Sequence, residues 1–517
     1  MVQILLSVQH FFIVSILIYY LHLLSIQGMT HLYDVAIIGA GVTGITLANS
    51  LSRHAKNLDF IVLEKDVRLG GRLKSEKINP KTGHIDKNNA QNNTYIMEHG
   101  AAWIHGPKKH PAMKYLKNEF QQVHEANIWA NPARFDLNAD LQVFREERIS
   151  NHLKVHVPSR IVKTSQQIVE TYLILYKDAI QAWRKYCQVS PEKANDMKLT
   201  ELKNAHSDFL NQGEVHEFLG FSEKLGDGYA ENDKIEILRG LDWCYNLVAV
   251  YFGDSNLDYY RMGNVYSERE DSDWALIGDC EGAHGKVKGG WEQIIEKLME
   301  ECGDDIRNRV KINCEVKSVT KVAKKPMAEE HVKIKYSNDT DITAKIVINT
   351  VPVKLWKEIE FKNFSAEKTS SMEKLEQKVV NVKMKKIWLG FDKPWWDTSK
   401  KLIACLSKGE GKRSGLIENP ANDFERSISQ AGLGYIENHV VTQGENVLLT
   451  AVVDEDCDLC GRLSDDEIGT GIAKCFESVM REKGSKLVWT RCSKWLEGGE
   501  GLERNELNRV ITAYAEF

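Results

Sequence analysis

An α/β fold with a Rossmann-type unit near the N-terminus is predicted by three neighbouring features of the sequence. The apolar run 35–38 ends abruptly in glycine, which is typical of a buried parallel strand. A G-x-G-x-x-G motif starts there, and apolar residues then recur at helical spacing. A second apolar run, 60–63, is followed by Glu64, twenty residues beyond the last glycine of the motif. Strand, turn, helix, strand and acid in this order favour a dinucleotide-binding unit over an unrelated glycine-rich turn.

Each glycine of the motif has a separate role in such a unit. Gly39 allows the tight turn, Gly41 lets the backbone approach a pyrophosphate, and Gly44 lets the helix pack closely on the strand. The helix points the positive end of its dipole at the phosphates. The carboxylate of Glu64 stands where it would accept both ribose hydroxyls of an adenosine.

Length and composition limit the remaining possibilities. A chain of 517 residues is too long for one core and predicts about two or three domains. Its 42% hydrophobic and 27% charged residues are ordinary for a globular protein. The formal net charge of −5, without a basic block, argues against nucleic acid as a partner and is compatible with a cationic small molecule.

Two further motifs narrow the dinucleotide to a flavin. Gly70-Gly71-Arg72 follows six residues after the acid, and 98–107 reads EHGAAWIHGP. The first motif resembles the G-G-R of the flavin-dependent amine oxidases, whose arginine lies near the pyrophosphate. The second resembles the segment that lines the isoalloxazine ring in polyamine oxidases, especially the spermine and N1-acetylpolyamine oxidases. With the later motifs, the resemblance extends from Tyr33 to Arg491.

This resemblance implies a discontinuous, Rossmann-type FAD-binding domain and an α+β substrate domain of the amine oxidase type. The expected segments are 30–110, 281–352 and 446–517 for the FAD-binding domain, and 111–280 and 353–445 for the substrate domain. From periodicity, helices are expected over 165–186 and 234–250, and strands over 310–319 and 331–336.

The same resemblance implies which residues hold FAD. The expected contacts are Gly39, Ala40, Gly41, Gly44, Glu64, Lys65, Gly71, Arg72, Gly100, Ala101, Ala102, Trp103 and Val316. Val316 would hold the adenine through its backbone, which is compatible with an ordinary core position for its side chain. The G-G-W at 289–291 and AKIVINTVP at 344–352 resemble later segments of the FAD-binding domain.

Lys386 is the most informative single residue. In the expected strand 379–391, alternation puts it on an otherwise apolar face, while Lys383 and Lys385 fall on a polar, solvated face. A lysine that points inward should have a lowered pKa. The sequence 386–391 resembles the amine oxidase motif K-I-x-L-x-F, whose lysine hydrogen-bonds through a water to flavin N5. The alternative is a surface lysine whose stem lies along the strand end.

His105, within the second motif, is the other candidate catalytic residue. A histidine at this position is typical of the animal-type polyamine oxidases that the motif resembles. A neutral imidazole beside the flavin would accept a hydrogen bond from a substrate amine. The alternative is a histidine that is bonded to backbone under the loop 107–111.

The N-terminal segment predicts a secretory route. Residues 1–26 contain no Lys, Arg, Asp or Glu, and a signal peptide within 1–28 is expected, although it lacks a basic n-region. The alternatives are a signal anchor, which would add membrane contact, and a start at Met29, which would give a cytoplasmic enzyme. Sequons at Asn92, Asn338 and Asn363 agree with secretion.

Ten cysteines in a chain of this length do not predict a disulfide framework. Cys457 and Cys460 form a C-x-x-C without a second pair at zinc-finger spacing. Two ordinary or mutually bonded cysteines are therefore expected there, and no metal site.

The C-terminal part departs from the family pattern. LVWTR at 487–491 resembles the family's V-x-T-R-W, with Cys492 in place of tryptophan. The family's later A-G-E motif, which supplies a second set of flavin contacts, does not follow. Three interpretations are open: a truncated product, a non-catalytic relative, or a degenerate substitute at 498–501.

The sequence therefore predicts FAD-dependent oxidation of polyamines, free or acetylated, by hydride transfer from substrate to flavin. The products would be an aldehyde, an amine and, after reaction with dioxygen, hydrogen peroxide. A pseudoenzyme that keeps the Rossmann unit as a scaffold is the main alternative. A porphyrinogen- or carotenoid-type oxidase is a third, and Lys386 argues against it.

Overall fold

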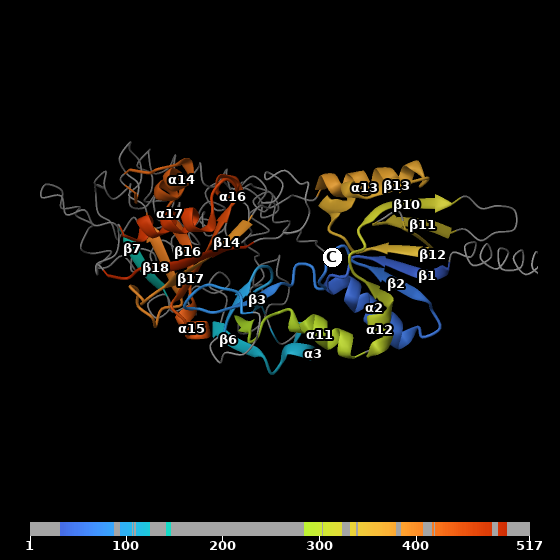
Figure 1. Cartoon of the computed structure of the whole chain (residues 1–517), viewed down its shortest axis with the longest axis horizontal. Helices are drawn as coiled ribbons and strands as arrows, with labels where there is room; N and C mark the ends of the chain where they lie inside the picture. Colours follow the sequence, from blue (N-terminus) through green and yellow to red (C-terminus); the bar gives the residue numbers. More distant parts are fainter. Residues whose placement is uncertain are drawn as a thin grey trace, which may run out of the picture. The chain divides into compact units, whose positions relative to one another are not determined.

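The computed structural model divides the chain into unit 1 (Met1–Leu73 and Glu292–Val379) and unit 2 (Lys74–Trp291 and Val380–Phe517), each a mixed α/β body (Figure 1). The residues whose structure is described are 31–86, 94–105, 107, 110–124, 141–145, 284–301, 303–322, 331–337, 340–378, 384–406, 416–417, 419–477 and 484–493.

Several expected features lie outside these residues. They include the N-terminal apolar segment, the helices over 165–186 and 234–250, Lys383 and residues 498–501. Among the residues that are described, no helix is long and apolar enough to cross a membrane.

Unit 1 is built on a seven-stranded mixed sheet. Its strands, in spatial order, are β13 (Glu360–Lys362), β10 (Val316–Val322), β11 (His331–Tyr336), β12 (Thr340–Asn349), β1 (Leu32–Ile38), β2 (Phe60–Leu63) and β9 (Val310–Lys311). The neighbours from β12 to β9 are parallel, whereas β11 is antiparallel to both β10 and β12. The apolar runs 35–38 and 60–63 are buried throughout, as expected for strands covered on both faces.

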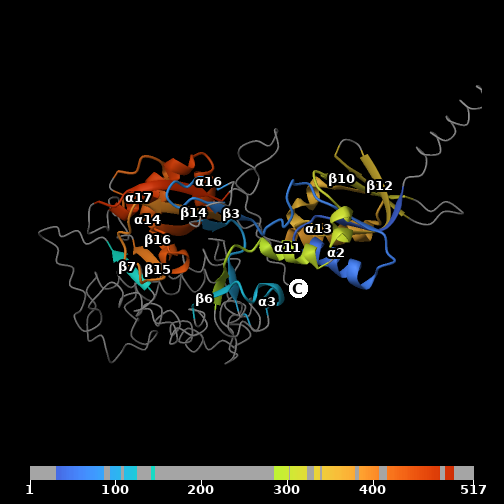
Figure 2. The ribbon, with the colours of Figure 1, turned by 60° about the horizontal axis from the view of Figure 1, so that its bottom comes forward.

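Helix α2 (Val42–His54) follows β1 directly and packs with α11 (Gln293–Glu300) and α12 (Asp304–Arg309). Figure 2 shows α2 and α11 side by side. The Asn49 side chain joins α2 to α11, because its amide nitrogen donates to Leu298 O at 2.7 Å. After β12 the chain continues through the 3₁₀ helix η2 (Val353–Glu358) and, beyond β13, through α13 (Ala366–Lys378).

The prediction of a single strand over 310–319 is wrong. The structure has two strands there: β9 at the sheet edge beside β2, and β10 between β13 and β11. The chain turns between them at Asn313, whose φ of 55° lies in the left-handed region that asparagine tolerates. The backbone of Glu64 fixes this turn, since its N–H donates to Lys311 O at 2.8 Å and its carbonyl accepts from Cys314 N at 2.7 Å.

Unit 2 contains a six-stranded sheet in the order β18 (Leu487–Cys492), β14 (Met384–Phe391), β17 (Val447–Val453), β16 (Leu433–Asn438), β15 (Leu402–Leu406) and β7 (Leu141–Arg145). Neighbours in it are antiparallel except β15 and β7. Two smaller sheets pair β3 (Ser75–Ile78) with β4 (Tyr95–Glu98), and β8 (His284–Val287) with β5 (Trp103–His105) and β6 (Phe120–His124). Two short helices, α3 (Met113–Leu116) and α15 (His439–Gln443), complete the described connections.

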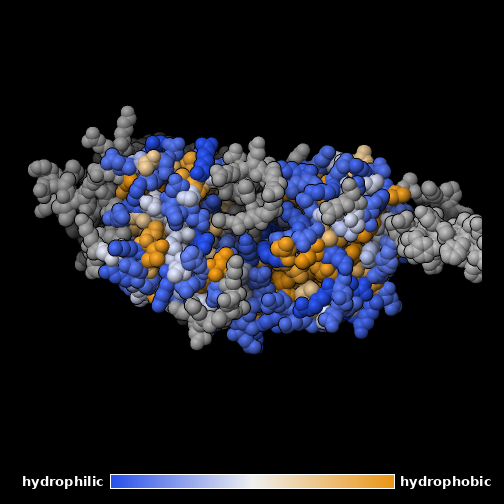
Figure 3. Space-filling view, in the orientation of Figure 1, coloured by the Kyte–Doolittle hydropathy of each residue, from blue (hydrophilic) through white to orange (hydrophobic). Residues whose placement is uncertain are grey.

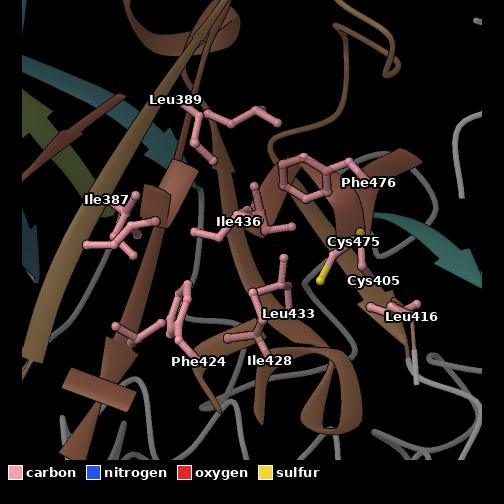
Figure 4. Packing of buried hydrophobic residues seen from close by; sticks show 14 of the residues in the cluster. Ile387, Leu389, Cys405, Leu416, Phe424, Ile428, Leu433, Ile436, Cys475 and Phe476 are labelled. Carbon is pink, nitrogen blue, oxygen red and sulfur yellow. The ribbon is translucent and has the colours of Figure 1, made fainter. Parts of the chain in front are cut away.

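Strand β14 is covered on both faces. One face carries Ile387 and Leu389 into a core with the helices α14 (Asp423–Ala431), α16 (Asp454–Cys460) and α17 (Asp465–Glu477), part of which Figure 4 shows. The other face carries Trp388, which packs in a second cluster with Tyr95 of β4 and Trp489 of β18.

The prediction that Lys385 lies on a solvated face is wrong, because only 7% of the residue is exposed. By strand alternation it shares the face of Ile387 and Leu389, and the helices of the core cover that face. Those helices come from later in the chain, so the local pattern of β14 gave no sign of them.

The two units divide the chain differently from the expected domains. Residues 94–105 and 447–493 belong to unit 2, whereas 353–378 stay in unit 1. Strand pairing explains the difference, because β17 and β18 flank β14 while β13 pairs with β10.

The described surface is mostly polar. Figure 3 shows predominantly hydrophilic residues on the visible face, in keeping with the 27% of charged residues. Figure 3 also shows hydrophobic residues gathered in a patch near the middle of this face. Among the described large hydrophobic residues, Val67 is the most exposed, at 69%.

Replacing Gly390 with alanine tests the packing of β14. The added Cβ would lie 2.1 Å from Trp489 Cε2, and this indole is fixed because its Nε1 donates to Pro80 O at 2.6 Å. Overpacking of this kind costs about 1–3 kcal/mol, so Gly390→Ala should lower the Tm in scanning calorimetry. At Gly444 a Cβ would meet nothing within 4 Å, so Gly444→Ala adds only the strain of its φ of 75°. An equal loss of Tm in this control would contradict the packing argument.

Candidate functional site

The turn between β1 and α2 has the geometry that a closely approaching ligand requires. Gly39 has a φ of 96°, and a Cβ at Gly44 would lie 2.0 Å from Gly39 O. At Gly41, by contrast, a Cβ would meet no atom within 4 Å. Gly41 is the N-cap of α2, which has no side-chain cap hydrogen bond. The turn thus leaves open space at the positive end of the helix, where a phosphate would be favoured.

Glu64 closes this turn against the end of β2. Its Oε2 accepts the Ala40 N–H at 2.7 Å, and its Oε1 accepts the Asp66 N–H at 2.9 Å. An ionised carboxylate oxygen accepts about two hydrogen bonds, so each oxygen keeps capacity for a further donor. The arrangement is compatible with the expected contact to ribose hydroxyls, which stays a prediction.

The G-G-R segment lies beside the glycine turn. The Gly70 N–H donates to Ala40 O at 2.9 Å, and Gly41 and Gly70 form a parallel β-bridge. Gly71 and Arg72 follow this bridge and are exposed. Two motifs that are thirty residues apart in the sequence therefore meet at one edge of unit 1.

Arg68 braces this segment and was not singled out from the sequence. Its guanidinium donates to Leu69 O at 3.0 Å, to Leu73 O at 3.1 Å and to Gly71 O. A side chain that binds three carbonyls fixes the turn that presents Arg72. Its only sequence signal was its place two residues before the glycine pair.

Thr350 supports the glycine turn from the end of β12. Its N–H and its hydroxyl both lie 2.9 Å from Ile38 O, and the hydroxyl lies 3.0 Å from Gly39 O. The resemblance of 344–352 indicated this segment, but not which of its side chains touches the turn.

Val316 and Lys65 complete the predicted contacts in unit 1. Val316 starts β10, is 6% exposed and pairs with Tyr336 of β11. Lys65 is exposed directly after Glu64. Their expected contacts with the dinucleotide stay predictions.

Lys386 points into unit 2. Its Nζ donates to Glu98 O at 2.9 Å and to Gly100 O. Ser493 fixes its backbone, because the Ser493 hydroxyl accepts the Lys386 N–H at 3.0 Å and the Ser493 N–H donates to Lys386 O at 2.8 Å. Burial lowers the pKa of Lys386 to about 8, while Glu437 and Glu98 oppose this shift. The structure thus agrees with an inward lysine rather than a snorkelling one.

Glu98 connects segments that are distant in sequence. Its carboxylate accepts the Ser75 hydroxyl at 2.8 Å and the Trp291 N–H at 2.7 Å. Gly290 makes this contact possible, since a Cβ there would lie 2.5 Å from Ser75 Oγ. Burial raises the pKa of Glu98 to about 7, although the bonds from Trp291 and Ser75 lower it. A carboxyl group that titrates near neutral pH therefore lies in the segment that holds Lys386.

Glu437 in β16 is a second buried carboxylate, which the sequence analysis missed. It is 5% exposed, accepts the Trp103 indole N–H at 3.1 Å and forms an ion pair with Lys286. Burial alone would raise the pKa of Glu437, but Lys286 and His439 hold it well below its usual range. Burial, reinforced by Lys286, lowers the pKa of His439 to about 4.

Strand β5 carries the remaining predicted residues. Ala101 and Ala102 lead into it, and Trp103 contributes its indole to the Glu437 carboxylate. The backbone of His105 pairs with His284 of β8, while its side chain lies outside the described structure. The role of His105 stays a prediction.

Cys457 and Cys460 are buried in α16 with their thiols reduced. The Cys457 thiol donates to Val452 O at 3.0 Å, and burial raises the pKa of Cys460 to about 12. They are core residues, and no disulfide joins them. Within the described ranges, no cluster of His, Cys, Asp and Glu side chains is suited to a metal ion.

Gly41→Ala tests the open space at the glycine turn. Because no protein atom lies within 4 Å of the added Cβ, the ligand-free Tm should stay within about 1 °C of the unaltered chain. The methyl group would occupy the approach of a dinucleotide, so FAD affinity should fall about tenfold or more, measured by fluorescence titration. Ser50→Ala, on the exposed side of α2, should change neither value. Unchanged affinity in Gly41→Ala would show that the dinucleotide does not lie there.

His439→Gln tests the buried network through acid stability. The pKa of His439 is about 6.5 in the unfolded chain and about 4 in the folded one. Between these two pH values mainly the unfolded state binds the proton. The free energy of unfolding therefore decreases as the pH is lowered, by up to about 1.4 kcal/mol per pH unit. His439→Gln removes this term, and its Tm should fall less steeply between about pH 6.5 and 4. His84→Gln, at an exposed histidine, should follow the unaltered chain, and identical slopes for all three would refute the assignment.

Three comparisons with known proteins bear on these motifs. The model of the family described as flavin containing amine oxidoreductase matches residues 42–499. Nicotine dehydrogenase of Pseudomonas putida is 23% identical over 339 residues, which cover 64% of this chain and 55% of that protein. The flavin-containing amine oxidase A of Canis lupus familiaris is 28% identical over 104 residues, 20% of this chain and 16% of that protein. The chain thus spans about half the length of the first relative and less of the second.

Among solved structures, a putrescine oxidase whose cofactor binding was redesigned by three mutations aligns with 90% of this chain. The alignment covers 84% of that chain, at 16% identity and a TM-score of 0.45.

Proposed function

This chain belongs to the flavin-containing amine oxidoreductase family, and we propose that it oxidises polyamines with FAD as its cofactor. Family membership supports FAD and an amine substrate. The resemblance of EHGAAWIHGP at 98–107 to the polyamine oxidases supports the narrower class. One observation carries the proposal: the partly buried side chain of Lys386 donates from its amino group to backbone carbonyls of this same motif.

The described residues of unit 1 fit the adenosine and pyrophosphate groups of FAD. The open space at Gly41, the N-terminus of α2 and the carboxylate of Glu64 suit these groups. The family resemblance implies that Lys386 and the segment from Gly100 to Trp103 contact the isoalloxazine, and this contact stays a prediction. When bound, FAD would supply the two-electron redox chemistry, and the protein would supply binding, orientation and proton handling.

The proposed proton handling depends on Lys386 and Glu98. Their pKa values, about 8 and about 7, lie close to neutral pH. A polyamine arrives mostly protonated, and its reacting nitrogen must be neutral before the adjacent C–H bond is oxidised. A buried amine and a buried acid that both titrate near pH 7 suit the acceptance and release of that proton.

The deciding experiment uses the full-length chain incubated with excess FAD. We expect an absorbance band at about 450 nm that bleaches when spermine is added without oxygen, and hydrogen peroxide when oxygen returns. Spermidine and acetylated polyamines would rank the substrates. A colourless, folded protein would reject the proposal and favour a non-catalytic scaffold. A yellow protein that no polyamine bleaches would reject the substrate class.

Lys386→Met should lower the rate of oxidation about 100-fold, since it removes the proposed proton-handling amine. The pH dependence near pH 8 should disappear in this variant, because the pKa of Lys386 is about 8. The rates are measured by stopped-flow absorbance over a pH series. Lys385→Met, at the neighbouring buried lysine on the opposite face of β14, should keep the pH profile. Full turnover in Lys386→Met would contradict the role proposed for Lys386.

A further inference from the structure

Glu437 lies at the centre of a buried polar group, called here the Glu437 box (Trp103, Lys286, Tyr435, Glu437 and His439). Its Oε1 accepts the Trp103 indole N–H at 3.1 Å and the Tyr435 hydroxyl. Its Oε2 lies 3.2 Å from His439 Nε2 and contacts Lys286 Nζ. All five residues belong to unit 2.

The ammonium group of Lys286 makes the contacts that a bound amine ligand would make in the box. Its Nζ contacts the carboxylate, lies 3.2 Å from His439 Nε2 and is 4.7 Å from the centroid of the Trp103 ring. A carboxylate and an aromatic face are groups with which proteins hold an ammonium ion. Lys286 belongs to β8, whose partners are β5 and β6, whereas Glu437 belongs to the six-stranded sheet. The ammonium group is therefore brought to the carboxylate by a different sheet.

The charge states suit an ammonium ligand. With the ammonium group of Lys286 in place, the pKa of Glu437 is held well below its usual range, so the carboxylate is ionised at neutral pH. His439 is neutral there, with a pKa of about 4, and the hydroxyl of Tyr95 bonds to its Nδ1. The box thus carries one negative charge, and one ammonium ion balances it.

The box also acts on Lys386. Glu437 is the foremost charged group among those that raise the pKa of Lys386, ahead of Glu98.

We propose that the Glu437 box is a binding site for a primary ammonium group, and that the chain fills it with its own Lys286. Lys286 then acts as a tethered competitor, and an external amine enters only when this side chain is displaced. A tethered group has an effective concentration of about millimolar or more, so dilute amines would not displace it. That the competing ligand is the terminal amino group of a polyamine rests on the proposed function; the ammonium chemistry of the box does not.

The test uses the full-length, flavin-free chain with Lys286→Met, which keeps an unbranched stem and removes the charge. Titration with n-butylammonium should raise the Tm of this variant saturably. Calorimetric affinity should be at least about tenfold higher than for the unaltered chain, in which Lys286 occupies the box. Neutral 1-butanol, of similar shape, should not reproduce the effect. The double variant Lys286→Met/Glu437→Gln should lose it.

Three outcomes would overturn the proposal: no response of Lys286→Met to butylammonium, an equal response to 1-butanol, or an undiminished response of the double variant. Lys286→Met leaves Glu437 without its counter-charge and folding can fail for that reason. In that case refolding yield is the readout. A refolding yield that recovers when butylammonium is added supports the proposal. If the yield does not recover although the double variant folds, the proposal is rejected.

The experiments distinguish a failure of the proposed amine site from a failure of the proposed oxidation. Amine binding is measured without FAD and without turnover, so its absence leaves the proposed oxidation standing. A colourless protein would end the proposed oxidation, but butylammonium binding by Lys286→Met would still be measurable.

Discussion

The burial of the Lys386 amino group is the constraint on which the rest of unit 2 depends. An ammonium ion removed from water requires acceptors, and the carbonyls of Glu98 and Gly100 supply them. Glu98 is the last residue of β4, and Gly100 lies in the segment between β4 and β5. The backbone of the motif around residue 100 thus binds the amino group of a lysine that comes almost three hundred residues later in the chain. Ser493 fixes the same lysine from the opposite end of the chain.

The sequence predicted the elements whose signal is local. The G-x-G-x-x-G turn, its two strands and Glu64 lie within about forty residues, and each step of that unit constrains the next. The inward direction of Lys386 followed from alternation, because one charged residue interrupted an apolar face. The prediction of a single strand over 310–319 was wrong because the deciding signal is not local. The turn at Asn313 depends on bonds from Glu64, which no pattern within the segment reveals.

Most of the missed residues have partners that are distant in sequence. Glu437 stands in an ordinary strand pattern, and only its contacts with Lys286 and Trp103 distinguish it. Thr350 binds the carbonyls of Ile38 and Gly39 in a distant segment, whereas Arg68 binds carbonyls of its own turn. Contacts of a side chain with backbone carbonyls leave no signal in the composition. Lys385 was assigned to solvent because strand alternation puts it on the same face as Lys383, whereas helices from later in the chain cover it. Single-sequence patterns report on one element at a time, and these roles arise between elements.

Among the described residues, the Glu437 box together with Lys386 and Glu98 contains two ammonium groups, Lys286 and Lys386, and two carboxyl groups, Glu98 and Glu437. His439 adds no charge above its pKa of about 4. Above about pH 7, where Glu98 is ionised, two positive and two negative charges balance. A further ammonium ion would leave a net positive charge in a medium of low polarity, which favours the loss of a proton. Lys386, with its pKa of about 8, gives up that proton most readily. Charge balance therefore couples the arrival of a cation in this interior to deprotonation of the lysine that the family motif singles out.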